Sequence, residues 1–250
     1  MKMIDIQNIS YAYGKTKVLD HFSHVFERCH FTAIMGVNGS GKSTLIRCIN
    51  GMNKVTSGQI FIKDKLINQM SVADIAQHIA YVPQVHQNLF PATVFDTVLA
   101  GRIPYMTWRP KTTDIEIVQD ILQEMNLTDM ALRDINQLSG GERQKVFIAR
   151  SLAQKTDIIL LDEPTSNLDV KHQMEIMALL QNLATTGKTI IMAIHDINMA
   201  LKYCNRFCMV KNGQLIASGS PLDIDKNLIK KVYDVDAEIV TINDKKIMIT

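Results

Sequence analysis

Residues 36–44, GVNGSGKST, place glycines, a lysine and hydroxyl side chains at the spacing G-x-x-x-x-G-K-[ST]. The apolar stretch before them reads as a strand and the stretch after them as a helix, which is the context in which this motif binds nucleotides. The glycines let the backbone wrap a polyphosphate with its N–H groups inward, Lys42 reaches the β- and γ-phosphates, and the Ser43 hydroxyl ligates Mg²⁺. A flexible turn with a solvated lysine is the alternative, and the flanking strand and helix count against it. The predicted nucleotide-binding residues of this loop are Asn38, Gly39, Ser40, Gly41, Lys42, Ser43 and Thr44.

Two adjacent carboxylates, Asp162 and Glu163, follow the apolar stretch at residues 158–161. Side chains at the carboxyl edge of a parallel sheet lie where open α/β folds bind their ligands. Asp162 is suited to holding Mg²⁺ there, directly or through water. Glu163 then faces an attacking water and can act as its general base. Acidic residues can also cap a strand end without further function, but the phosphate loop in the same predicted sheet favours a catalytic pair.

A second glycine turn, Ser139-Gly140-Gly141 within LSGGERQ, opens onto a helical pattern. Such a turn presents backbone N–H groups at the positive end of a helix, which is an anion-binding arrangement. A chain that already has a phosphate loop does not need a second one for its own nucleotide. The turn therefore raises the question of whose phosphate it binds.

The composition restricts the class of protein. A chain of 250 residues with 46% hydrophobic and 21% charged residues is ordinary for a soluble globular protein. Its formal net charge of +2, without a Lys/Arg cluster, gives no electrostatic reason to expect a nucleic-acid partner. No run reaches the ~18 apolar residues of a membrane span, and the strand-like N-terminus lacks the apolar core of a signal peptide. We therefore expect a soluble protein that stays inside the cell, with Cys204 and Cys208 as small buried residues rather than half of a metal site.

Strand and helix patterns alternate in the first and last thirds of the chain, which predicts a parallel sheet, while residues 85–155 show almost only helical spacing. The last residues, 237–250, read as a hairpin that finishes the fold; a regulatory ligand site there is the less favoured alternative. Predicted strands cover 3–13, 17–26, 30–36, 58–67, 157–164, 188–196 and the hairpin 206–219, and predicted helices cover 42–50, 93–102, 114–126, 141–154, 171–187 and 197–204.

With GVNGSGKST, LSGGERQ and LLDEP in this order, the whole chain resembles the nucleotide-binding subunit of ABC transporters. The resemblance implies that Tyr13 stacks on adenine with Val18 beside it, that Gln84 is the Q-loop glutamine, and that His195 is the switch histidine. Read alone, Tyr13 could be an ordinary strand aromatic and His195 a structural histidine. Their joint order and spacing favour the functional roles.

The resemblance also implies the architecture: an α/β P-loop NTPase cassette whose mainly parallel core carries an antiparallel β subdomain and an inserted helical subdomain. Residues 1–84 and 156–250 would form the core with the β subdomain, and residues 85–155 the helical subdomain with the signature motif. Two cassettes would pair head to tail as a homodimer, which answers the question of the second turn. The residues expected to act on the partner's ATP are Ser139, Gly140, Gly141 and Asp169.

The implied reaction is hydrolysis of Mg-ATP by in-line attack of water. Lys42 would stabilise the transition state, Glu163 would activate the water, and His195 would contact the γ-phosphate. Gln84 would sense Mg²⁺ and the lytic water. The predicted metal ligands are Ser43, Gln84 and Asp162.

The partners follow from the same resemblance. One cassette without a membrane span is similar to importer subunits that dock on separate integral-membrane permeases at the cytoplasmic face of the membrane and serve a substrate-binding protein indirectly. The segments AGRIPY and IKKVYDV favour the subgroup that moves iron-siderophores, haem and cobalamin. Zinc, manganese or molybdate importers remain alternatives, as does a soluble ABC ATPase such as an iron–sulfur assembly scaffold.

Overall fold

The computed structural model describes residues 1–84, 91–242 and 245–249 of the chain. Its strands are β1 (Lys2–Tyr13), β2 (Thr16–Glu27), β3 (Phe31–Met35), β4 (Ser57–Ile62), β5 (Lys65–Leu66), β6 (Ile79–Val82), β7 (Ile158–Asp162), β8 (Thr189–Ala193), β9 (Arg206–Lys211), β10 (Gln214–Gly219), β11 (Glu238–Ile242) and β12 (Lys245–Ile249). Its helices are α1 (Lys42–Ile49), α2 (Val72–His78), α3 (Val94–Leu99), α4 (Thr112–Glu124), α5 (Gly140–Ala153), α6 (Val170–Thr185), α7 (Ile197–Tyr203) and α8 (Lys226–Tyr233). Short 3₁₀ helices are η1 (Ile67–Gln69), η2 (Ala100–Tyr105), η3 (Thr128–Met130), η4 (Ile135–Gln137) and η5 (Pro221–Asp223).

A six-stranded sheet in the order β10-β9-β3-β8-β7-β6 forms the centre of the fold, and all neighbours in it are parallel except β10 and β9. Strands β3, β7 and β8 are buried along their whole length, as expected when both faces of a parallel sheet are covered. Successive residues point to opposite faces: in β7, Ile159 and Leu161 join one hydrophobic core, whereas Ile158 and Leu160 join the other.

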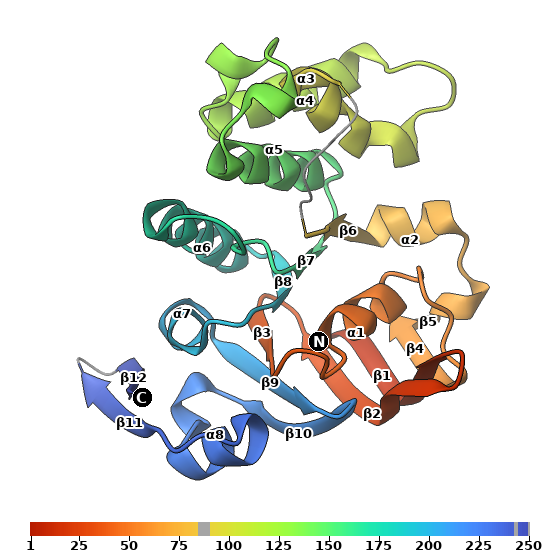
Figure 1. Ribbon diagram of the computed structural model, residues 1–250. Coiled ribbons are helices and arrows are strands. Elements are labelled where there is room, and N and C mark those ends of the chain that lie inside the picture. The colour runs from red at the N-terminus through yellow and green to blue at the C-terminus, as the bar shows by residue number, and fades with distance from the viewer. Residues whose placement is uncertain (85–90, 243–244, 250) are drawn as a thin grey trace.

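The antiparallel sheet β2-β1-β4-β5 forms the second layer, and α1 packs between it and the central sheet (Figure 1). Phe22 and Phe26 from β2 and Leu45 and Ile49 from α1 belong to this core and are fully or almost fully buried. Because α1 starts directly after β3, this packing fixes the phosphate loop between two layers.

Helices α3, α4 and α5 form a separate group beyond the β6 edge of the central sheet (Figure 1). A buried ion pair stabilises it: the Arg102 guanidinium donates to Asp114 Oδ1 at 2.9 Å and to the Ala153 carbonyl at 2.9 Å, which ties η2 to α4 and α5. Gly101 allows the close approach, since a Cβ there would lie 2.1 Å from the Arg150 carbonyl oxygen.

The predicted fold class is confirmed, including the mainly parallel core, the antiparallel sheet and the helices. Two helices, α2 and α8, were not predicted from the sequence, because they are short and each buries only one or two side chains. The turn of the predicted C-terminal hairpin and residues 85–90 lie outside the described residues, whereas β11 and β12 pair as expected. Cys204, the C-cap residue of α7, and Cys208, in β9, are both buried, as expected.

Candidate nucleotide site

The loop between β3 and α1 has the shape required of a phosphate cradle. Gly36 and Gly41 adopt φ values of 150° and 106°, which L side chains rarely reach. A Cβ at Gly36 would lie 2.1 Å from the Val210 carbonyl oxygen, and one at Gly41 would lie 2.9 Å from the carbonyl oxygen of Val18. Gly41 caps α1 without any side-chain hydrogen bond, so the first turn of the helix presents its N–H groups to the loop.

Lys42 is only 4% exposed and points back into its own loop. Its Nζ donates to the carbonyl oxygens of Gly36 at 2.9 Å and Val37 at 3.1 Å. Burial lowers the pKa of Lys42, and the nearby Glu163 and Asp162 carboxylates oppose that shift. A cation held at the mouth of an N–H-lined loop is the arrangement that binds a polyphosphate.

Ser43, in the first turn of α1, and Asp162, the last residue of β7, lie in contact although 119 positions separate them in sequence. The Ser43 hydroxyl donates to Asp162 Oδ1 at 2.7 Å. Burial raises the pKa of Asp162, and the hydrogen bond from Ser43 opposes that rise. A hydroxyl beside a carboxylate is a pair of hard oxygen donors. Among the described residues no cluster of three or more His, Cys, Asp and Glu side chains offers a metal site elsewhere.

Glu163 is the meeting point of the predicted catalytic residues. His195 Nε2 contacts its Oε1, and the Gln84 amide nitrogen lies 3.4 Å from its Oε2. The backbone of Glu163 is in the left-handed region at φ 50°, an uncommon conformation for glutamate that is held by a bond from its N–H to the Ala193 carbonyl at 3.2 Å. This turn directs the carboxylate away from the end of β7 and toward His195 and Gln84.

Ser166 is a member of this group that the sequence did not indicate. The Gln84 amide nitrogen lies 3.3 Å from the Ser166 hydroxyl, and that hydroxyl donates to the Glu163 carbonyl at 2.9 Å. Ser166 therefore joins the end of β6 to the turn after β7. Its place in EPTSNLD, directly after the acidic pair, was the available signal.

An open cavity of about 490 Å³ unites most of the predicted nucleotide-site residues. Ser40 does not line it: the Ser40 hydroxyl is buried without a hydrogen-bond partner among the described residues, and the Ser40 N–H bonds to the Val37 carbonyl. Asp162 lies behind the cavity, against Ser43. The lining residues are Tyr13, Val18, Asn38, Gly39, Gly41, Lys42, Ser43, Thr44, Glu163 and His195.

Tyr13 stands at the rim of this cavity and is 46% exposed. Its hydroxyl accepts a hydrogen bond from Asn53 at 3.0 Å, and its ring meets Tyr11 edge to face with centroids 4.9 Å apart. Asn53, which follows the C-terminal end of α1 and which the sequence did not indicate, thus helps to orient the ring. An exposed, oriented aromatic face at the edge of a polyphosphate cavity is suited to stacking on a base.

The residues expected to act across a dimer form a second group, and none of them lines the cavity just described. Ser139 caps α5 through a capping box: its hydroxyl donates to Glu142 Oε2 at 2.7 Å and accepts from the Glu142 N–H at 3.3 Å. Asp169 caps α6 and accepts from the His172 N–H at 2.9 Å. In the single chain both side chains are therefore engaged in local hydrogen bonds and do not line the cavity of their own phosphate loop.

Replacing Tyr13 by alanine is expected to weaken nucleotide binding by about 1–3 kcal/mol, because one base–aromatic stack is lost. GTP should be affected as well as ATP, since stacking reads the face of the base. Tyr13→Phe is the matched control: it keeps the ring, removes the hydroxyl with its bonds to Asn53, Thr44 and Arg47, and should bind nearly normally. Calorimetric titration checks this. Unchanged affinity of Tyr13→Ala for both nucleotides would mean that another aromatic residue stacks on the base, such as Tyr11, whose ring contacts that of Tyr13.

Comparison with known proteins agrees with this geometry. The family model described as "ABC transporter" matches residues 19–166. The chain is 41% identical over 240 residues to the ABC transporter ATP-binding protein MJ0089 of Methanocaldococcus jannaschii, covering 96% of this chain and 94% of that one. It is 37% identical to the petrobactin import ATP-binding protein YclP of Bacillus subtilis, covering 98% of both chains.

Solved structures give the same result. A metal-chelate type ABC transporter in an inward-facing conformation superimposes with a TM-score of 0.86 and 25% identity, covering 99% of this chain and 96% of that chain. The ATP-binding cassette MJ0796, a dimer bound to ADP and Pi after hydrolysis, matches with a TM-score of 0.74 and 30% identity, covering 88% of this chain and 99% of that chain.

Proposed function

The chain belongs to the ABC transporter family and is an ATP-binding cassette ATPase, and we propose that it powers an importer that takes up a metal chelate through separate membrane subunits. The observation that carries this proposal is the cavity that brings the phosphate loop, Glu163 and His195 together. Relatives that share nearly the full length of the chain are named for petrobactin import and for iron(3+)-hydroxamate import, which supports an iron chelate such as an iron-siderophore as the cargo.

The proposed division of labour follows from the contacts in the cavity. Lys42 and the loop N–H groups neutralise the charge that develops on the γ-phosphate, after Lys42 exchanges its loop carbonyls for phosphate oxygens. Glu163 takes up the proton of the attacking water. His195 and Gln84, which both contact this carboxylate, hold it in position and meet the γ-phosphate and the water.

The residues present fit a magnesium ion. The Ser43 hydroxyl and the Asp162 carboxylate already lie together at 2.7 Å, and Gln84, two residues beyond β6, would add an amide oxygen. Hydroxyl, carboxylate and amide oxygens are the donors that Mg²⁺ accepts, usually with several waters. When bound with ATP, the ion would neutralise charge on the β- and γ-phosphates.

A head-to-tail dimer completes the proposed site. Ser139, Gly140, Gly141 and Asp169 lie outside their own chain's nucleotide cavity, which supports a role for them toward the phosphates held by a second copy. The resulting twofold assembly has two identical sites, each closed by the partner's signature turn. Contact with phosphate requires the Ser139 hydroxyl to turn its proton away from Glu142.

Ser139→Arg is expected to abolish hydrolysis, with a loss of about 100-fold or more, because a bulky side chain occupies the phosphate-facing turn. ATP binding to the single chain should be unchanged, since Ser139 is not part of that cavity. Ser139→Ala measures the effect of losing the N-cap of α5 alone. It should lower the free energy of unfolding by only ~1 kcal/mol, the usual effect of a lost N-cap. Steady-state turnover and titration on the same preparations check this, and normal turnover by Ser139→Arg would exclude the interface.

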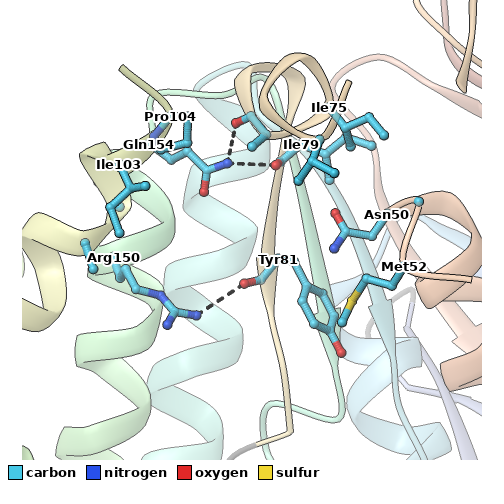
Figure 2. A pocket seen from close by; sticks show the side chains of 14 residues that line it. Asn50, Met52, Ile75, Ile79, Tyr81, Ile103, Pro104, Arg150 and Gln154 are labelled. Atoms are coloured by element: carbon cyan, nitrogen blue, oxygen red, sulfur yellow. Dashed lines mark hydrogen bonds between the residues drawn. The ribbon is translucent and has the colours of Figure 1, made fainter. Parts of the chain in front are cut away.

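The membrane partner is proposed to dock on the groove shown in Figure 2, which lies between α2 and β6 on one side and η2 and α5 on the other. Gln154 spans its upper end by donating to the carbonyls of Ala76 and Ile79, the latter at 2.8 Å. Arg150 reaches the Tyr81 carbonyl at 3.5 Å. The groove therefore joins the helical group to the strand that leads into Gln84, so an occupant can respond to events at the nucleotide.

The rim of this groove carries exposed apolar side chains. Val72 is 86% exposed, Ile103 is 63% exposed and Met52 is 61% exposed. In the described residues no helix is long and apolar enough to span a bilayer. A short helix of a permease subunit, apolar toward the groove and placed at the cytoplasmic face of the membrane, is the occupant that fits these side chains.

Charges at the rim should uncouple the cassette from its membrane partner. Val72→Asp combined with Ile103→Asp is expected to reduce the amount of membrane protein that is purified with the cassette about 10-fold or more. A tenfold loss of affinity corresponds to about 1.4 kcal/mol, and burying an unpaired carboxylate costs at least that much. Turnover of the isolated cassette should be unchanged, because neither side chain lines the nucleotide cavity. Undiminished recovery with this double variant would place the docking surface elsewhere.

The test of the proposed function is recovery of the partner and cargo. The tagged cassette, purified from detergent-solubilised membranes, should bring a polytopic membrane protein with it, and that complex in vesicles should move an iron-siderophore only with Mg-ATP inside the cassette's compartment. A cassette that is recovered with soluble assembly proteins instead would contradict the importer proposal.

A further inference from the structure

His172 occupies a position between the two segments that are proposed to act on the partner's ATP. It lies in the first turn of α6, three residues after Asp169, and its Nδ1 is 2.9 Å from each oxygen of the Asp169 carboxylate. Its own N–H donates to Asp169 Oδ1 at 2.9 Å. Two separate donors of one residue therefore fix this carboxylate, and they lower the pKa of Asp169.

The other face of the His172 ring lies on the signature turn. A Cβ built at Gly141 would be 2.2 Å from His172 Cδ2 and 2.4 Å from its Cγ, so no side chain fits at position 141 while the ring is in place. Gly141 has no positive φ that would demand glycine. Gly140 differs, since a Cβ there meets only Leu168 Cδ2 at 3.4 Å, an ordinary contact. The glycine at 141 is thus explained by His172 within one chain.

We propose that His172 is a positioning residue that holds the signature turn and the Asp169 carboxylate as one unit, so that both reach the partner's nucleotide together. The proposal rests on the head-to-tail dimer proposed above. The turn belongs to α5 and the carboxylate to α6, helices that lie next to each other (Figure 1). Without the ring, each segment can still fold, but their relative placement is no longer fixed at the interface.

Three substitutions of His172 distinguish the effect of its hydrogen-bond donor Nδ1 from the effect of the bulk of its ring. His172→Ala removes both and should lower kcat about 10-fold, the effect of losing one hydrogen bond to a charged group, while single-chain ATP affinity changes less than about 2-fold. His172→Asn places an amide N–H where Nδ1 stood and should recover most of kcat. His172→Leu keeps the bulk over Gly141 without a donor and should remain slow.

A matched control uses the same two helices. Lys145 of α5 pairs with Glu175 of α6 at 2.7 Å, one turn beyond the contact of Gly141 with His172. Lys145→Ala breaks this link without touching Asp169, and should leave kcat within about 2-fold of the parent, as expected for an exposed ion pair. If Lys145→Ala slows turnover as much as His172→Ala, general helix packing accounts for the effect and the proposal is overturned.

The thermal stability of the single chain tests the steric contact between Gly141 and the His172 ring. Gly141→Ala should lower the melting temperature by roughly 2–4 °C or more, whereas Gly140→Ala should not. In the His172→Ala background the added Gly141→Ala should cost almost nothing, because the clash has gone. Equal losses in both backgrounds would contradict the contact.

The closing experiment compares Glu163→Gln with Glu163→Gln/His172→Ala on a sizing column with Mg-ATP. We expect the first to elute as a dimer and the second to need at least about 10-fold more protein to do so, with His172→Asn restoring the dimer in place of alanine. If both dimerise equally, His172 does not position the interface. If Glu163→Gln itself stays monomeric, the proposed dimer fails, and the two failures are thereby distinguished.

Discussion

Glu163→Gln is expected to bind Mg-ATP normally and to hydrolyse it 10²–10⁴-fold more slowly than the parent, a barrier increase of about 3–5 kcal/mol. Glutamine keeps the size and shape of the side chain, so its contacts with Gln84 and His195 can be re-formed. It cannot accept the water's proton. Binding survives because Lys42 and the loop N–H groups supply the phosphate contacts.

The slow variant should also trap the closed pair of cassettes. With Mg-ATP it should elute from a sizing column as a dimer, and with ADP or without nucleotide mainly as a monomer, since each ATP bridges two chains in the proposed dimer. Asp162→Asn is the neighbouring comparison: it disturbs the pair with Ser43 and should impair Mg-ATP binding itself. Rapid turnover by Glu163→Gln would remove this carboxylate from the proposed role.

Lys42→Ala is expected to lower both ATP affinity and hydrolysis by about 100-fold or more. Lys42 is the cation of the loop, and each charge-assisted hydrogen bond to a phosphate is worth about 1.5–3 kcal/mol. The substitution removes the bonds from Lys42 to the Gly36 and Val37 carbonyls, but the close approach of Gly36 to Val210 and of Gly41 to Val18 should keep the course of the loop.

Thermal melting distinguishes lost binding from lost folding in this variant. Mg-ATP at about 100 times the parent's dissociation constant should stabilise the parent by about 2.7 kcal/mol and leave the Lys42→Ala variant almost unchanged. Lys226→Ala, which removes an exposed lysine of α8, should respond as the parent does. A normal ATP-dependent shift in Lys42→Ala would contradict the site assignment.

Most of the fold could be predicted because its elements carry local signals. The continuous apolar run of β7 is the local signal of a strand buried on both faces, and the glycines that flank α1 mark where that helix begins and ends. Helix α2 was missed because only Ile75 of its seven residues is buried, so no apolar stripe marks it. Its capping box, Ser71 with Asp74, was the one local signal.

The candidate site was predictable to the extent that it consists of contiguous motifs. Contacts between motifs were not. Ser166 joins Gln84 across 82 positions, and His172 covers Gly141 across two helices. Such contacts depend on how β6, β7, α5 and α6 pack, which no single segment encodes. The Ser139 hydroxyl differs, because its bond to Glu142 is a local capping box within one segment; that bond competes with the contact that the resemblance implies.

The placement of two lesions tests the claim that each nucleotide is held between the phosphate loop of one chain and the signature turn of the other. Differently tagged Glu163→Gln chains carry Lys42→Ala and Ser139→Arg either on opposite chains or on the same chain, paired with an otherwise intact partner. On opposite chains both lesions fall in one composite site and leave the second intact; on the same chain each site receives one lesion. We expect Mg-ATP-dependent co-capture of the two tags only with the lesions on opposite chains, and equal co-capture in both arrangements would contradict the claim.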